Sequence, residues 1–107
     1  MELNSLYDIA EKENIQIYDW QIEDVDGMYL NYHNINAIAL KYDRLGTYIN
    51  EKCTLSEELG HYYMDATYPA STTDKTLIDK QEYRAKKWSY ICLIPFENLK
   101  SAILNRN

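Results

Sequence analysis

Two carboxylates and a histidine lie close together in the middle of this 107-residue chain, in the sequence E-E-L-G-H. Glu57 and His61 belong to a segment, residues 47–65, whose apolar spacing predicts a helix. Residues four apart share one helical face, which is the spacing of two ligands of one metal ion. Glu58 holds the position of the water-activating base in H-E-x-x-H, the helical zinc-hydrolase motif. The pattern therefore predicts a metal site in which Glu57 stands where that motif has its first histidine.

Glu82 is a further acidic residue that the pattern places on an inward-facing surface. It belongs to a second predicted helix, residues 77–92, and shares its apolar stripe with Ile78, Ala85, Trp88 and Cys92. A buried carboxylate needs a partner, which is either a metal ion or a cation such as Arg84 or a lysine. The small side chains of Ala85 and Ser89 leave room beside it for another helix and for a ligand.

The elements that would position these residues follow from periodicity and turn residues. An amphipathic helix is predicted over residues 2–12 and a strand over residues 15–20. Two further strands, residues 28–32 and 35–40, are separated by a predicted turn at His33 and Asn34, and we expect His33 to be a turn residue rather than a metal ligand.

Capping and turn residues predict where the remaining helices begin and where a loop lies. Either Asp43 or Thr47 can cap the helix that carries the motif. Residues 66–75 are predicted to form a loop. A short final helix is predicted to begin at Pro95 and to contain Phe96, Leu99, Ala102 and Ile103. We expect a single α+β domain over residues 1–107, with a small three-stranded antiparallel sheet packed beside the helix pair.

The amino-acid composition and charge argue against two classes of function. The formal charge is -6, without a clustered basic face, so direct binding of nucleic acid is not expected. No apolar run reaches the roughly 20 residues of a membrane span, and the first residues do not have the pattern of a signal peptide. These observations predict a cytoplasmic protein without membrane contact. In that compartment Cys53 and Cys92 are expected to be reduced and buried in the core.

The motif and its surroundings resemble the ImmA/IrrE family of metallo-endopeptidases, which is found in bacteria, phages and mobile elements. The resemblance rests on E-E-L-G-H-Y-Y from Glu57, on E-Y-R-A-K-K-W-S from Glu82, and on L-I-P-F-E-N-L from Leu93. It covers the chain from about Leu3 to Leu99. The order of elements is also similar: a leading helix, a small sheet, the motif helix, and a helix with a downstream glutamate.

This resemblance implies a zincin-like helix pair and a zinc-dependent peptidase. His61 and Glu82 would be metal ligands, Glu58 the catalytic base, and Glu57 would occupy the position of the first ligand. The implied substrate is a helix-turn-helix repressor of a phage or mobile element. Two carboxylates and one imidazole make a harder donor set than the usual histidine-rich site, so Zn²⁺ should bind more weakly and Mn²⁺ should compete better.

Simpler interpretations of the same residues stay open at this point. Glu57 and Glu58 can belong to a solvated acidic face, and His61 can be a core histidine bonded to a backbone carbonyl. If the carboxylates do converge without a cation, at least one of them should keep its proton through a raised pKa. The alternative function is a catalytically impaired module that binds a repressor or another protein without cleaving it.

Overall fold

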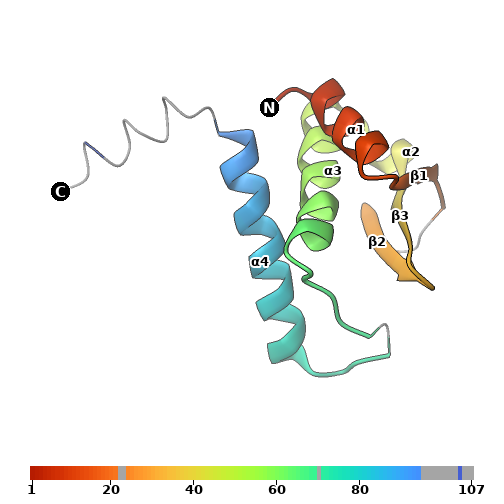
Figure 1. The fold of residues 1–107 in the computed structure, drawn as a ribbon, viewed down its shortest axis with the longest axis vertical. Helices are drawn as coiled ribbons and strands as arrows, with labels where there is room; N and C mark the ends of the chain where they lie inside the picture. Colours follow the sequence, from red (N-terminus) through yellow and green to blue (C-terminus); the bar gives the residue numbers. More distant parts are fainter. Residues whose placement is uncertain (22–23, 70, 95–103, 105–107) are drawn as a thin grey trace.

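The computed structural model describes residues 1–21, 24–69, 71–94 and 104, and it contains both helices and a sheet (Figure 1). The predicted α+β class is confirmed. The short helix predicted from Pro95 lies outside the described residues. None of the described helices is long and apolar enough to cross a membrane. The elements are, in order, α1 (Leu3–Lys12), β1 (Gln16–Asp19), β2 (Gly27–Tyr32), β3 (Ile35–Leu40), α2 (Tyr42–Leu45), α3 (Tyr48–Tyr63) and α4 (Lys75–Leu93).

The three strands form a mixed sheet, so the prediction of a purely antiparallel sheet was wrong. Strand β3 lies between the other two, antiparallel to β2 and parallel to β1. The physical reason is burial, because Ile38, Ala39 and Leu40 are almost completely buried and their strand takes the central position. The predicted hairpin of β2 and β3 is correct. Its turn is formed by His33 and Asn34, which both have positive φ values of 50° and 65°, as two-residue hairpin turns require.

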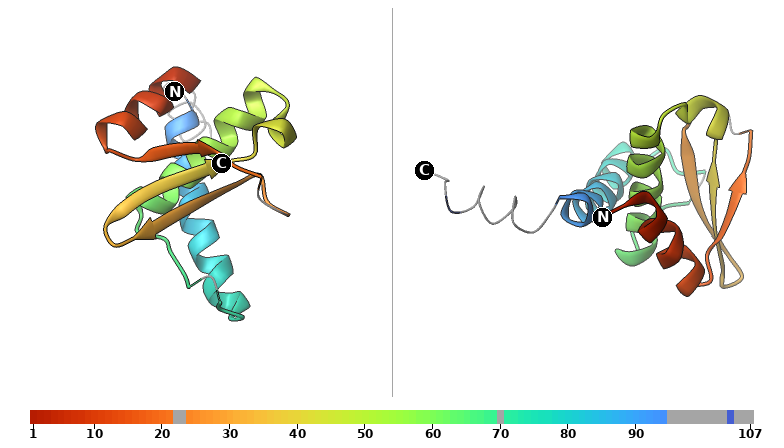
Figure 2. Two further views of the ribbon diagram at one scale, coloured as in Figure 1. Left: turned by 90° about the vertical axis from the view of Figure 1, so that its right-hand side faces the viewer. Right: turned by 90° about the horizontal axis from the view of Figure 1, so that it is seen from above.

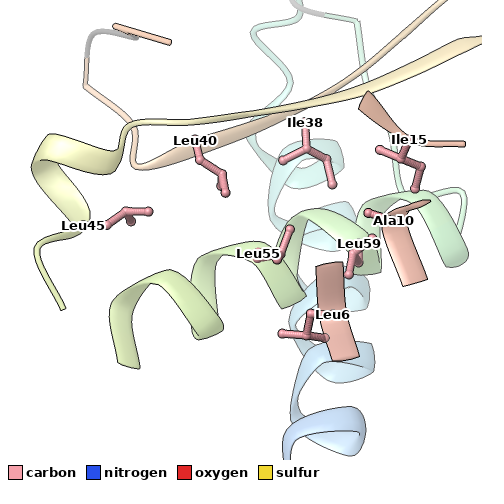
Figure 3. Close-up of a cluster of buried hydrophobic side chains, with 8 residues drawn as sticks. All are labelled: Leu6, Ala10, Ile15, Ile38, Leu40, Leu45, Leu55 and Leu59. Atoms are coloured by element: carbon pink, nitrogen blue, oxygen red, sulfur yellow. The ribbon is translucent and has the colours of Figure 1, made fainter. Parts of the chain in front are cut away.

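Helices α1 and α3 cover one face of the sheet, and α4 packs on the far side of α3 (Figure 2). Between the sheet and these two helices lies the hydrophobic core, to which α1, α3 and β3 each contribute (Figure 3). Its buried members are Leu6, Ala10, Ile15, Ile38, Leu40, Leu45, Leu55 and Leu59. Helix α3 contacts α1, α2, α4, β2 and β3, so its position determines where the motif residues lie.

Both long helices begin at side-chain caps. The Thr47 hydroxyl accepts a hydrogen bond of 3.1 Å from the Asn50 backbone N–H, so Thr47, not Asp43, is the cap of α3. The Asp74 carboxylate accepts a similar bond from the Leu77 N–H, and α4 therefore begins two residues before the predicted start. The predicted loop between these helices is correct over residues 66–69 and 71–74.

Helices α3 and α4 approach each other closely because small residues face each other between them. The buried hydroxyls of Ser56 and Ser89 are hydrogen-bonded. One turn further along α3, a Cβ atom on Gly60 would collide with the carbonyl oxygen of Ala85. Only glycine permits this separation of the two backbones, and the adjoining His61 and Glu82 are brought together as a result.

Replacement of Gly60 by alanine tests this close approach. In an ordinary helix the change would stabilise the protein by about 1 kcal/mol, because alanine is the better helix former. Here we expect destabilisation by about 1–3 kcal/mol, the range for overpacking a tight contact, seen as a lower midpoint of thermal unfolding by circular dichroism. Ser5→Ala, at an exposed position of α1, is the control and should be nearly neutral. An unchanged or higher midpoint for Gly60→Ala would contradict the packing argument.

Candidate functional site

All four residues singled out in the sequence line one cleft between β2, α3, the loop after α3, and α4. The cleft has a volume of about 1250 Å³. Seven consecutive residues, Val25 to Asn31, form one wall, so the cleft follows the outer edge of β2, with which no other strand of the described residues pairs. Gly27 allows this strand to lie close to α3, since a Cβ atom there would be 2.8 Å from the Thr54 methyl group. A smaller hollow of about 340 Å³ between α1 and β1 lies apart from the four residues.

His61 is held in a defined orientation at the base of this cleft. Its side chain is nearly buried, and its Nδ1 atom lies 2.6 Å from the carbonyl oxygen of Ala66. If Nδ1 carries the hydrogen, it donates to that carbonyl and leaves Nε2 as the acceptor or metal-binding atom. The carbonyl bond is what a core histidine would make, and it is equally what orients a ligating imidazole.

Glu82 faces His61 from the neighbouring helix. Its Oε2 atom lies 3.4 Å from His61 Nε2, and its Oε1 atom accepts a 2.8 Å hydrogen bond from the Tyr68 hydroxyl. Hydrogen bonding from His61 lowers the pKa of Glu82, partial burial opposes this effect, and the Tyr68 bond adds to it. Burial alone would lower the pKa of His61, but the bonds to Glu82 and Ala66 raise it to about 9.

Glu58 is the most deeply buried carboxylate of the cleft, with 9% of its surface exposed. Burial raises its pKa to about 7, while the His61 charge and a backbone hydrogen bond from Tyr29 oppose that rise and the charges of Glu82 and Glu57 add to it. The expected raised pKa is found on Glu58, although burial contributes more to it than the charges of the neighbouring carboxylates. A carboxyl group that titrates near neutrality is suited to accepting and returning protons.

Glu57 lies on the same face as His61 and is half-buried. Partial burial raises its pKa, the positive charge of Lys86 lowers it, and Glu82 raises it again. Cys53 lies four residues before Glu57 and lines the same cleft, where it is exposed. The prediction of a buried Cys53 was wrong, because the spacing of four that aligns the motif residues also carries this thiol onto their face.

The cleft offers acidic side chains and a histidine to a divalent cation. Five carboxylates line it, from Asp26, Glu57, Glu58, Asp65 and Glu82, so its charge favours cations. The nitrogen-to-oxygen separation of 3.4 Å in the pair of His61 and Glu82 is close to that of two atoms bound at about 2.0–2.2 Å to one tetrahedral ion. In the part of the chain that the structure describes, no group of three or more His, Cys, Asp or Glu side chains is already arranged to hold a metal. Two donors face each other, and a third would have to move towards them.

The loop after α3 supplies contacts that sequence reasoning missed. Tyr68 holds Glu82, and the Ala66 carbonyl holds His61, yet an isolated tyrosine in a Thr- and Ser-rich loop carries no recognisable signal. Arg84, the cation considered as a partner of Glu82, donates instead to the backbone carbonyl of Met64 and to Gln81. Its role is to attach α4 to the end of α3.

The two raised pKa values predict how the stability of the metal-free protein depends on pH. The folded protein retains a proton on Glu58 between about pH 4.5 and 7, and on His61 between about pH 6.5 and 9, where the unfolded chain has released it. The stabilisation is therefore present at low pH and is lost as the pH rises through these windows. The lowered pKa of Glu82 acts in the opposite direction, below about pH 4.5.

Urea unfolding in the presence of a chelator should accordingly show a falling midpoint between pH 5 and 9. Glu58→Gln removes the titrating group and should flatten the part of the curve below pH 7. Glu11→Gln, on the exposed surface of α1, should leave the curve as it is in the wild type. A midpoint that rises from pH 5 to 9 would show that the two shifts have the wrong sign.

No protein-family model, curated protein or solved structure matches this chain in comparisons of its sequence and fold.

Proposed function

We propose that this protein is a metal-dependent peptidase of the ImmA/IrrE type, with α3 and α4 as a zincin-like helix pair. The observation that carries the proposal is the meeting of His61 Nε2 and Glu82 Oε2 at 3.4 Å, at the base of a cleft that Glu57 and Glu58 also line. His61 and Glu82 would hold Zn²⁺ or Mn²⁺, with Glu57 as the third ligand after a side-chain movement. When bound, such a cation supplies Lewis-acid chemistry, the polarisation of water and of a carbonyl group.

The side chains of the chain have distinct tasks in this proposal. Glu58, in its carboxylate form, takes the proton from the attacking water and later gives it to the leaving amine. Without a metal its pKa is about 7, and a bound cation would lower this pKa and so favour the carboxylate form that accepts the proton. The Ala66 carbonyl fixes the ring of His61, and the Tyr68 hydroxyl fixes one oxygen of Glu82 so that the other faces the histidine.

The shape of the cleft suits an extended polypeptide. Its volume of about 1250 Å³ exceeds the roughly 300–1,000 Å³ of small-molecule pockets. One wall is the outer edge of β2, whose backbone can pair with an added strand. The substrate proposed from the family resemblance is a regulatory protein, such as a helix-turn-helix repressor, rather than nucleic acid, in a cytoplasmic setting.

A second candidate function is a module that binds the same kind of protein without cleaving it. It is favoured by one observation, namely that the described residues contain no ready arrangement of three metal-binding side chains. In this candidate, the pair of His61 and Glu82 is an ion pair that joins α3 to α4, and the cleft serves only for binding.

A measurement of metal binding distinguishes whether His61 and Glu82 are metal ligands or only an ion pair. Titration calorimetry with ZnCl₂ and with MnCl₂ should detect one site in the wild-type protein. His61→Ala and Glu82→Ala should abolish it, and Tyr68→Phe should weaken it by about 10–100-fold, as loss of an orienting partner does. His33→Ala is the matched control, because it removes the other histidine of the chain from an exposed turn. Equal losses in His33→Ala and His61→Ala, or binding that survives in His61→Ala, would contradict the assignment.

Cleavage separates the enzyme from the binding module. The purified protein with Zn²⁺ should shorten the helix-turn-helix regulator encoded beside it, as followed by mass spectrometry. Glu58→Gln should retain metal binding and reduce the cleavage rate by about 10²–10⁴-fold, the usual contribution of a general base. A regulator that binds the wild-type protein and is never shortened would establish the second candidate.

A further inference from the structure

The outer face of the sheet carries apolar side chains although none of the described elements covers it. Ile38 and Leu40 point into the core, so the alternate residues of β3 point away from it. The strand register then places eight residues on the outer face. They are Gln16, Tyr18, Met28, Leu30, Tyr32, Ile35, Ala37 and Ala39. Viewed from above, helices α1, α3 and α4 lie together on the other side of the sheet (Figure 2, right).

The composition of this face is unusual for a surface in water. A sheet with one solvated face normally alternates apolar residues inside with polar residues outside. Here Gln16 is the one side chain of the eight with an amide, and none of the eight is charged. In the whole chain 26% of the residues are charged, so a set of eight outer-face positions without any charge is uncommon. The sheet face is therefore a distinct apolar surface, and surfaces of this kind mark sites of association.

The exposed area is in the range that a stable pair of proteins needs. Tyr18, Tyr32 and the adjoining Trp20 are 51%, 73% and 55% exposed. Together these three side chains expose about 350 Å², if a free aromatic side chain has about 200 Å². Ile35 adds a further exposed side chain, at 64%, and Met28 and Leu30 are 38% and 36% exposed. The face thus approaches the roughly 600–1,000 Å² that each partner contributes to a stable interface.

The side chains of the outer sheet face can pack against an identical face. The central strand carries the small Ala37 and Ala39, whereas the flanking strands carry Tyr18 on one side and Met28 and Leu30 on the other. Ala39 is only 1% exposed between Tyr18 and Met28, so these larger side chains form the surface at that point. An identical face turned by a two-fold rotation can pack against them. The net charge of -6 makes two copies repel, but the face itself brings no charge into the contact.

We propose that two copies of this chain pair through the outer sheet faces, as the two sheets of a β-sandwich do. This pairing buries Tyr18, Leu30 and Ile35 and leaves α4 on the outside of the dimer. His61 and Glu82 lie on the opposite side of the sheet, between α3 and α4, although Met28 and Leu30 of the outer face also line the edge of the cleft. The pairing is tested by association alone, so its outcome does not depend on the proposed peptidase activity.

Sedimentation velocity of the full chain over a concentration series tests the pairing. We expect a dimer for the wild type, and a dissociation constant at least about 100-fold higher for Tyr18→Lys and for Ile35→Lys, because each change buries two uncompensated charges in the interface. Tyr83→Lys is the matched control, since Tyr83 is an exposed tyrosine of α4 at 66%. It introduces the same charge on a surface outside the proposed contact and should dimerise like the wild type. Circular dichroism of each variant confirms that it is folded.

Several outcomes would overturn the proposal. The first is a wild-type chain that stays monomeric at the highest concentration that can be reached, including the case in which it captures a different protein through this face. The second is a dimer that Tyr18→Lys and Ile35→Lys leave intact. The third is equal weakening by Tyr83→Lys, which would reflect charge in general rather than this surface.

Discussion

The structure depends on the close approach of α3 and α4 at Gly60 and Ala85. A side chain larger than hydrogen at position 60 would meet the Ala85 carbonyl, and the neighbouring hydroxyls of Ser56 and Ser89 are bonded at the same interface. Two backbones at this separation bring their flanking side chains into contact range. Every polar contact of His61 with α4 follows from this approach, so the chemistry of the cleft is a consequence of helix packing.

The cleft balances several opposing electrostatic effects. Burial disfavours the charged forms of Glu58 and of His61, whereas their proximity favours opposite charges on them. The outcome near pH 7 is a Glu58 carboxyl group that is about half protonated and an imidazolium ion on His61, with Glu82 as the charged partner. A cation that binds here displaces the protons that these acidic groups retain. Metal binding at the site therefore depends on pH.

Sequence reasoning succeeded where local patterns determine the outcome. The three longer helices, the hairpin turn at His33 and Asn34, and the grouping of Glu57 with His61 follow from spacing within a few residues, and Thr47 was one of two predicted caps. Sequence reasoning failed where the outcome depends on contacts between distant segments of the chain. The insertion of β3 between β1 and β2 depends on which strand is the most apolar, and the contact of Tyr68 with Glu82 depends on the path of a loop. The meeting of His61 and Glu82 was expected from the family resemblance and not from spacing.

Helix α4 rests mainly on α3, with Arg84 and the loop before it as further attachments. The two halves of the cleft therefore meet at a single interface between helices. A ligand that bridges His61 and Glu82 adds a contact between α3 and α4. Binding in the cleft should therefore also strengthen the attachment of α4 to the rest of the molecule.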